Sequence, residues 1–317
     1  MIDNLLLEKL FSGDRRAVAR IISVVESDNN LTSEYLKSIY NKVGNAYRIG
    51  ITGPPGAGKS TITNQLTKLF RKENKKVGII AVDPTSPFTG GALLGDRVRM
   101  NDIGMDQGVF IRSMATRGSL GGLSKKAIDT ADILDAAGSD IIILETVGVG
   151  QSELDIAQAA DTTIVVLVPE SGDSVQAMKA GLMEIADLFV LNKCDRPGSQ
   201  QAYTALQTIL MIKQHDENTW LPKIIKAVAS ENKGMDEVLN EIENHKKFLL
   251  EKNLFQLKRE NRTKVRIKEI VENKLREKLW TQTSESLLNS SMKNVMLGNS
   301  SPYDIAEEIL NQFVNNR

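Results

Sequence analysis

Between residue 47 and about residue 244, short apolar runs of strand character alternate with longer stretches whose apolar residues recur at helical spacing. The runs are rich in Val and Ile, which is typical of strands in a parallel sheet that is covered on both faces. The predicted strands are residues 47–52, 77–82, 109–112, 140–144, 163–168, 188–191 and 223–228. Ligands of such sheets bind at the carboxyl ends of the strands, so we expect functional residues there.

Both flanks of this region have a helical pattern. Residues 1–45 predict an N-terminal helical arm, with a turn and a helix cap at residues 12–14. This arm could be a docking element or a packed layer. Residues 251–317 predict a C-terminal helical extension, with one long helix at 264–280 and a last helix that Ser301 and Pro302 begin. Such a tail often mediates dimerisation, and the region between the flanks, residues 46–250, would be the main domain.

Composition narrows the class of protein. The chain has 317 residues, a formal net charge of +0 and 41% hydrophobic residues, which is enough for one sizeable α/β domain with extensions. The balanced charge gives no general case for binding nucleic acid or an acidic membrane surface. One cysteine permits no intramolecular disulfide, and we read neither a secretion signal nor an apolar run of the ~18 residues that span a bilayer. We therefore expect a cytoplasmic protein.

One stretch fits the phosphate-binding pattern G-x-x-x-x-G-K-[ST] at every fixed position, between a predicted strand and a predicted helix. Its residues and the next one are Gly53, Pro54, Pro55, Gly56, Ala57, Gly58, Lys59, Ser60 and Thr61. Glycines let the backbone wrap a phosphate, whose charge the backbone N–H groups and the helix N-terminus then meet. Lys59 can reach the β- and γ-phosphates, and the hydroxyl of Ser60 can bind Mg²⁺. The sequence therefore predicts an α/β P-loop NTPase with a mostly parallel central sheet between N-terminal and C-terminal helical extensions.

A second motif indicates which base is bound. Asn192, Lys193, Cys194 and Asp195 follow a predicted strand and fit N-K-x-D. The Asp195 carboxylate can accept hydrogen bonds from the ring N1–H and the exocyclic amine of guanine, a pair of donors that adenine lacks. Lys193 would lie along the base, and Asn192 would link this loop to the phosphate loop.

The loop after the last predicted strand would complete the base site. It holds Val228, Ala229 and Ser230, and the backbone N–H of Ala229 could donate to the guanine O6.

Acidic residues at strand ends are candidates for the Mg²⁺ shell. Glu145 and Asp83 end apolar runs, whereas Asp96 lies in a glycine-rich segment that could close over the nucleotide. Water attacks the terminal phosphate in this chemistry, and both Gln151 and Asp96 are candidates to position it. The catalytic candidates are thus Lys59, Asp96, Glu145 and Gln151.

Longer stretches resemble the MeaB/ArgK family of P-loop GTPases, the methylmalonyl-CoA mutase-associated GTPases. The segments that carry the resemblance are residues 50–56, 82–86, 90–100, 110–118, 121–123 and 145–153, with weaker matches at 13–17 and 25–27. The resemblance implies a homodimeric, Mg²⁺-dependent GTPase that binds GTP and GDP, with Asp83, Asp96 and Glu145 in the metal shell. It further implies a chaperone that escorts an adenosylcobalamin-dependent acyl-CoA mutase, gates cofactor loading and protects the mutase.

The sequence departs from the family at two loops. Ser119 stands where many relatives carry His, and residues 170–176 differ from the pattern Gly-x-Gly-Asp-Glu-Leu-Gln. The resemblance implies that the second loop signals to the mutase, so its change concerns the partner more than the GTPase activity.

Two other functions use the same nucleotide-binding core. A metal-insertion GTPase chaperone would need Cys and His ligands, whereas the two histidines, His215 and His245, are far apart and expected on solvated helix surfaces. A P-loop kinase of a small molecule or a protein would use adenine, against which the N-K-C-D motif argues.

Overall fold

The computed structural model describes residues 2–27, 31–83, 101–115, 125–146, 152–169, 181–212, 216 and 219–315. The chain divides into two compact units, Met1–Gln256 and Leu257–Arg317, which are treated separately below.

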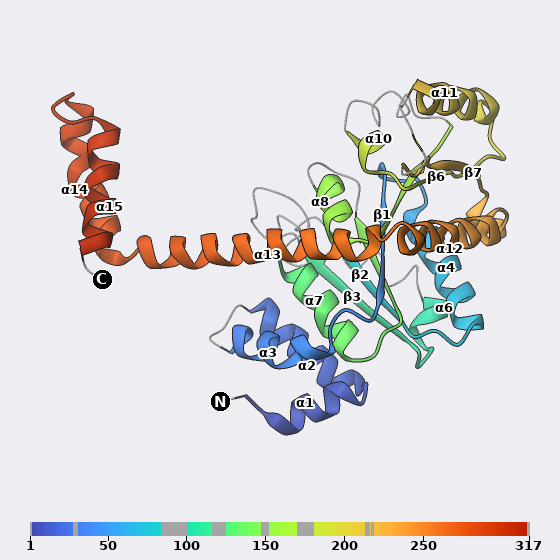
Figure 1. Ribbon diagram of the computed structural model, residues 1–317, viewed down its shortest axis with the longest axis horizontal. Helices are drawn as coiled ribbons and strands as arrows, with labels where there is room; N and C mark the ends of the chain where they lie inside the picture. The colour runs from blue at the N-terminus through green and yellow to red at the C-terminus, as the bar shows by residue number, and fades with distance from the viewer. Residues whose placement is uncertain are drawn as a thin grey trace. The chain divides into compact units, whose positions relative to one another are not determined.

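A seven-stranded sheet forms the centre of the first unit (Figure 1). Its strands are β1 (Tyr47–Thr52), β2 (Val77–Asp83), β3 (Val109–Ala115), β4 (Ile141–Thr146), β5 (Thr162–Leu167), β6 (Leu188–Leu191) and β7 (Lys223–Lys226). Their order is β3-β2-β4-β1-β5-β6-β7, and every pairing is parallel. All carboxyl ends therefore lie along one edge, and the predicted α/β class is confirmed.

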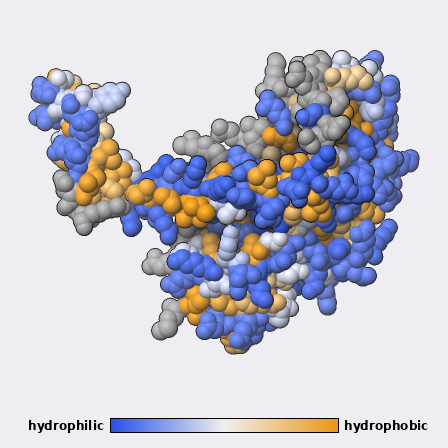
Figure 2. All heavy atoms as spheres, in the orientation of Figure 1, coloured by the Kyte–Doolittle hydropathy of each residue, from blue (hydrophilic) through white to orange (hydrophobic). Residues whose placement is uncertain are grey.

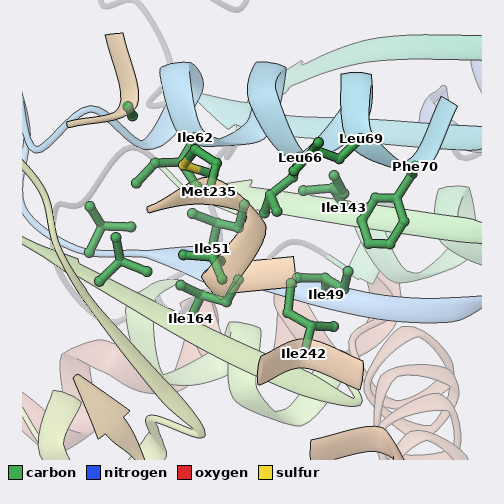
Figure 3. Close-up of a cluster of buried hydrophobic side chains, with 14 of the residues drawn as sticks. Ile49, Ile51, Ile62, Leu66, Leu69, Phe70, Ile143, Ile164, Met235 and Ile242 are labelled. Carbon is green, nitrogen blue, oxygen red and sulfur yellow. The ribbon is translucent and has the colours of Figure 1, made fainter. Parts of the chain in front are cut away.

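One face of the sheet packs against α4 (Lys59–Lys72), α6 (Asn101–Gly104) and α12 (Met235–Glu251). Figure 3 shows Ile62, Leu66 and Phe70 of α4 above Ile49 and Ile51 of β1. The side chains of successive strand residues point to opposite faces, so every second residue of β1 enters this core. Helix α4, which follows the phosphate loop, is thus fixed to the centre of the sheet.

The opposite face packs against α7 (Lys125–Ala136), α8 (Ser152–Ala159) and the N-terminal helices α1 (Asn4–Phe11), α2 (Arg15–Glu26) and α3 (Thr32–Ile39). The helix cap predicted at residues 12–14 is confirmed, because Asp14 Oδ1 accepts a hydrogen bond from the backbone N–H of Ala17 at 2.8 Å. A short helix, η1 (Tyr40–Lys42), leads into β1. The N-terminal helices share a continuous apolar core with α7, so they form a packed layer.

The far end of the sheet is covered by α10 (Leu182–Ile185) and α11 (Ser199–Ile212), which pack on β5 and β6. His245 of α12 lies beside Thr162, the first residue of β5, and is 2% exposed. Its Nδ1 lies 2.8 Å from Thr162 Oγ1, and its ring packs on Trp220. The expectation of a solvated His245 is therefore wrong.

The second unit consists of helices: most of α13 (Leu254–Leu279), α14 (Gln282–Met296) and α15 (Pro302–Asn315). Helices α14 and α15 pack on each other, and Ser301 Oγ accepts a hydrogen bond from the N–H of Asp304, as the cap predicted. Figure 2 shows apolar residues at the surface of these helices, and no residue of α13 is buried. Within the described part of the chain, no helix is both long and apolar enough to cross a bilayer.

Candidate nucleotide-binding site

The predicted phosphate loop lies at the centre of the carboxyl edge of the sheet. It connects β1 to α4, and β1 lies between β4 and β5. The chain runs from β1 to strands on one side and later to β5–β7 on the other, so this is the position where the strand order reverses. Open α/β sheets bind their ligands at such a position.

Gly58 brings the phosphate loop against the second motif. Its φ is +93°, a left-handed conformation that residues with a side chain rarely adopt. A Cβ on Gly58 would lie 2.3 Å from Nδ2 of Asn192. That nitrogen donates a hydrogen bond to the carbonyl of Ala57 at 2.8 Å. The predicted link between Asn192 and the phosphate loop is present.

Lys59 is buried at the start of α4. Its Nζ donates hydrogen bonds to the carbonyl oxygens of Gly53 at 2.7 Å and Pro54 at 2.8 Å. The ammonium is therefore held over the loop that it is expected to serve, where a phosphate could replace the carbonyls as its partner.

Ser60 and Glu145 were predicted separately as metal ligands, and the structure brings them together. Ser60 Oγ donates to Glu145 Oε1 at 2.5 Å, and Thr63 Oγ1 donates to Glu145 Oε2 at 2.7 Å. The Glu145 carboxylate is buried near the end of β4, so these two hydroxyls fix its orientation. No sequence motif includes Thr63, although its position three residues after Ser60 puts both hydroxyls on one side of α4.

The N-K-C-D motif forms a turn after β6. Lys193 has a left-handed φ of 58°, and its Nζ donates to the carbonyl of Gly56 at 2.8 Å. Cys194 anchors the turn through its N–H, which donates to the carbonyl of Ala227 at 3.1 Å. Asp195 is exposed at this edge, where a carboxylate that reads a base would have to lie.

Burial raises the pKa of the Cys194 thiol above its ordinary value, an effect that outweighs the hydrogen bond with Ala227 and the charge of Lys226. The thiol is therefore neutral near pH 7 and packs as a small side chain beside the turn.

The loop after β7 contacts both motifs. The N–H of Ala229 donates to Asn192 Oδ1 at 3.0 Å, so this donor, which we expected at the guanine O6, already has a partner in the protein. Val228 pairs with Lys233, and Ala229 and Ser230 belong to the short helix η2 (Ala229–Glu231). Gln65 of α4, which no motif includes, donates from Nε2 to the carbonyl of Ala229 at 3.2 Å.

The remaining predicted residues are only partly described. Asp83 ends β2 at the same edge of the sheet, beside β4. Asp96 and Gln151 lie outside the described residues, as do Ser119 and residues 170–176. Thr61 is exposed in the first turn of α4.

Comparison with known proteins agrees with this geometry. A protein from Pyrococcus abyssi is 48% identical over 316 residues, which cover 99% of this chain and 97% of that protein. The GTPase ArgK of Escherichia coli is 36% identical over 297 residues, covering 91% of this chain and 86% of its own. A crystal structure of a LAO/AO transport system kinase matches with a TM-score of 0.75 at 28% identity, covering 99% of both chains.

The family model described as methylmalonyl-CoA mutase-associated GTPase MeaB matches residues 18–284. This range includes the phosphate loop, Glu145, the N-K-C-D turn and the loop after β7. The chain belongs to the MeaB family of GTPases.

Proposed function

We propose that this protein is a Mg²⁺-dependent GTP hydrolase that acts as a chaperone of an adenosylcobalamin-dependent acyl-CoA mutase. It would gate loading of the cofactor and protect the mutase from inactivation. The hydrolase part rests on one observation, the set of hydrogen bonds that joins the phosphate loop, Asn192, Lys193 and Ala229 at one edge of the sheet. The mutase part rests on the family to which the chain belongs.

Nucleotide binding would replace some hydrogen bonds within the protein by hydrogen bonds to the nucleotide. Lys59 would turn from the carbonyls of Gly53 and Pro54 to the β- and γ-phosphates. Asp195 would accept hydrogen bonds from N1–H and the exocyclic amine of guanine. Asn192, which bonds to both Ala57 and Ala229, would hold the loop that binds the base at a fixed position relative to the phosphate loop.

The donor set fits Mg²⁺, a hard cation that takes oxygen ligands and usually retains several waters. Ser60 Oγ and Glu145 Oε1 face each other across a hydrogen bond, so after moving apart both could serve one small cation, Glu145 directly or through water. Asp83 and Asp96 are further candidates for its shell. Bound there, the ion would neutralise charge that develops on the phosphate oxygens.

Hydrolysis needs no covalent intermediate. An oxygen of water would bond to the γ-phosphorus while the bond to the β–γ bridging oxygen breaks, which gives GDP, phosphate and one proton. Lys59 would stabilise the charge on the phosphates. Gln151 and Asp96 are the candidates to orient the water. A low intrinsic rate that a partner raises is the expected pattern.

We also propose a homodimer formed through the C-terminal helices. Ile267, Val271 and Leu275 follow one another at four-residue intervals on α13 and are 56%, 50% and 43% exposed. A stripe of this kind is typical of a helix that packs on another chain.

The deciding experiment measures GTP and ATP hydrolysis by the purified protein, with and without a cobalamin-dependent acyl-CoA mutase from the same organism. Turnover of GTP alone, accelerated by the mutase, is the expected result. GTP turnover that the mutase does not change would remove that partner and favour another client, such as a metal-dependent enzyme. ATP turnover would overturn the base assignment and favour a kinase.

A further inference from the structure

Gln65 links the helix of the phosphate loop to the loop on the base side. It lies on α4, six residues after Lys59 in the chain, and its Nε2 donates to the carbonyl of Ala229 at 3.2 Å. Ala229 is 1% exposed, so its carbonyl has little access to water as an alternative partner. The same carbonyl also accepts the backbone N–H of Asn232 at 3.2 Å within its own loop, so Gln65 is the donor that ties this carbonyl to α4.

Both backbone groups of Ala229 are held by side chains from different elements. Its N–H donates to Oδ1 of Asn192, whose Nδ2 donates to the carbonyl of Ala57. Its carbonyl accepts from Gln65, and Gln65 leads back to Ala57 along α4 and the phosphate loop. These three hydrogen bonds and the chain from Ala57 to Gln65 form a closed ring that joins the phosphate loop, the turn after β6 and the loop after β7.

A closed ring constrains position more strongly than a single link. The pairing of Val228 with Lys233 shapes the loop after β7, and Asn192 makes the first side-chain bond between Ala229 and another element. The second bond, from Gln65, fixes the opposite side of the same peptide segment. Lys193 adds a separate contact to Gly56 that does not involve Ala229, so it cannot replace Gln65 in this role.

We propose that Gln65 is a positioning residue for base recognition, acting through Ala229 and not by touching the nucleotide. This inference rests on the proposed guanine site. The loop after β7 would face the six-position oxygen of the base, whereas Asp195 would read the two-position amine. Loss of Gln65 should therefore weaken the binding of every nucleotide that has a 6-oxo purine base and leave the binding of phosphate chains unchanged.

The test uses Gln65→Met in the full-length protein, which removes the donor at nearly constant shape and charge. We expect GDP and IDP to bind about three- to tenfold more weakly, by the same factor for both, as for loss of one hydrogen bond. Binding of tripolyphosphate, measured by competition with a fluorescent nucleotide, should stay at the wild-type value. Gln65→Lys restores a donor and should recover most of the GDP affinity. Lys72→Met, at an exposed position of the same helix, should bind all three ligands like the wild type.

A second variant distinguishes failure of the role proposed for Gln65 from failure of the proposed guanine site. Asp195→Asn should change the ratio of GDP to IDP affinity, because only GDP carries the two-position amine. If that ratio does not change, the guanine site itself is wrong. If it changes but Gln65→Met binds GDP like the wild type, or loses tripolyphosphate equally, the role of Gln65 is overturned. A fall in melting temperature with unchanged GDP affinity would likewise show a structural role alone.

Discussion

The amide of Asn192 lies in the space where a side chain on Gly58 would have to be. A Cβ on Gly58 would come within 2.3 Å of Nδ2 of Asn192, and the φ of +93° adds backbone strain for any residue with a side chain. The last glycine of the phosphate motif thus serves the base side of the site as well as the phosphate side.

Gly58→Ala should therefore disrupt nucleotide binding through Asn192. We expect GDP to bind at least about tenfold more weakly, because the alanine must displace the amide that links two loops. Gly56→Ala is the matched control. Its φ is +75°, and apart from its chain neighbours no described atom lies within 4 Å of the place a Cβ would take, so this variant has the backbone strain without the collision. Equal losses in the two variants, measured by titration with a fluorescent nucleotide, would contradict this explanation.

Thr63 should stabilise the fold through Glu145. Thr63→Val keeps the shape of the side chain but leaves one oxygen of a buried carboxylate without this hydroxyl. We expect a loss of about 1–3 kcal/mol in the free energy of unfolding, measured by urea denaturation. Thr67→Val is the comparison, since Thr67 is equally buried but donates to the backbone carbonyl of Thr63. A loss in Thr63→Val no larger than that in Thr67→Val would argue against a special role for the carboxylate.

The thiol of Cys194 should make the stability of the folded protein fall as the pH rises. Burial raises the pKa of its thiol in the folded protein, so the unfolded chain releases this proton first as the pH rises. The contribution of the neutral thiol to stability is complete below the unfolded pKa of about 8.5 and is lost as the pH rises through the folded pKa. The fall in urea midpoint between about pH 7 and about pH 9.5 should accordingly be smaller in Cys194→Ala than in the wild type.

Because Cys194 is the only cysteine in the sequence, reaction with iodoacetamide reports on it alone. Near neutral pH the folded protein should react more slowly than the urea-unfolded chain, since the thiolate is the reactive form. Equal rates would contradict a raised pKa.

The apolar stripe on α13, formed by Ile267, Val271 and Leu275, can be tested by placing a charged side chain in it. Val271→Glu should weaken a dimer at least about tenfold, because each copy would bury an unpaired charge. Lys274→Glu changes charge on the same helix without changing the apolar stripe, and it should leave the mass in solution, measured by light scattering, unchanged. A wild-type protein that is monomeric at micromolar concentration would remove the homodimer proposal.

The sequence was most informative where a local pattern decides the structure. Strands β1 and β6 begin and end as predicted, since both are bounded by clear turn signals. Strand β3 runs on to Ala115 because it pairs with β2 as far as Asp83, a partner that local sequence does not reveal. Helix α13 begins at Leu254 and not at 264, since nothing between these positions interrupts a helix.

The site was predictable in its motifs but not in its cross-links. The motifs predicted that Ser60 and Glu145 serve one metal site and that Asn192 links to the phosphate loop. In the structure Ser60 bonds to Glu145, and Asn192 bonds to Ala57. Gln65 and Thr63 carry no motif, and their roles depend on partners that lie far away along the chain. His245 could have been placed correctly, because it continues the buried spacing of Val238, Ile242 and Leu249 on α12.

The cross-links also determine when the site can exist. Asn192 is 135 residues from Ala57 along the chain, and Gln65 is 164 residues from Ala229. During synthesis, the phosphate loop emerges long before the segments that complete it, and the ring closes only after β7 has joined the sheet. Since a ligand that binds only the native state stabilises it by mass action, guanine nucleotide would favour finished first units over incomplete ones. Nucleotide occupancy would thus report that the whole sheet has been assembled.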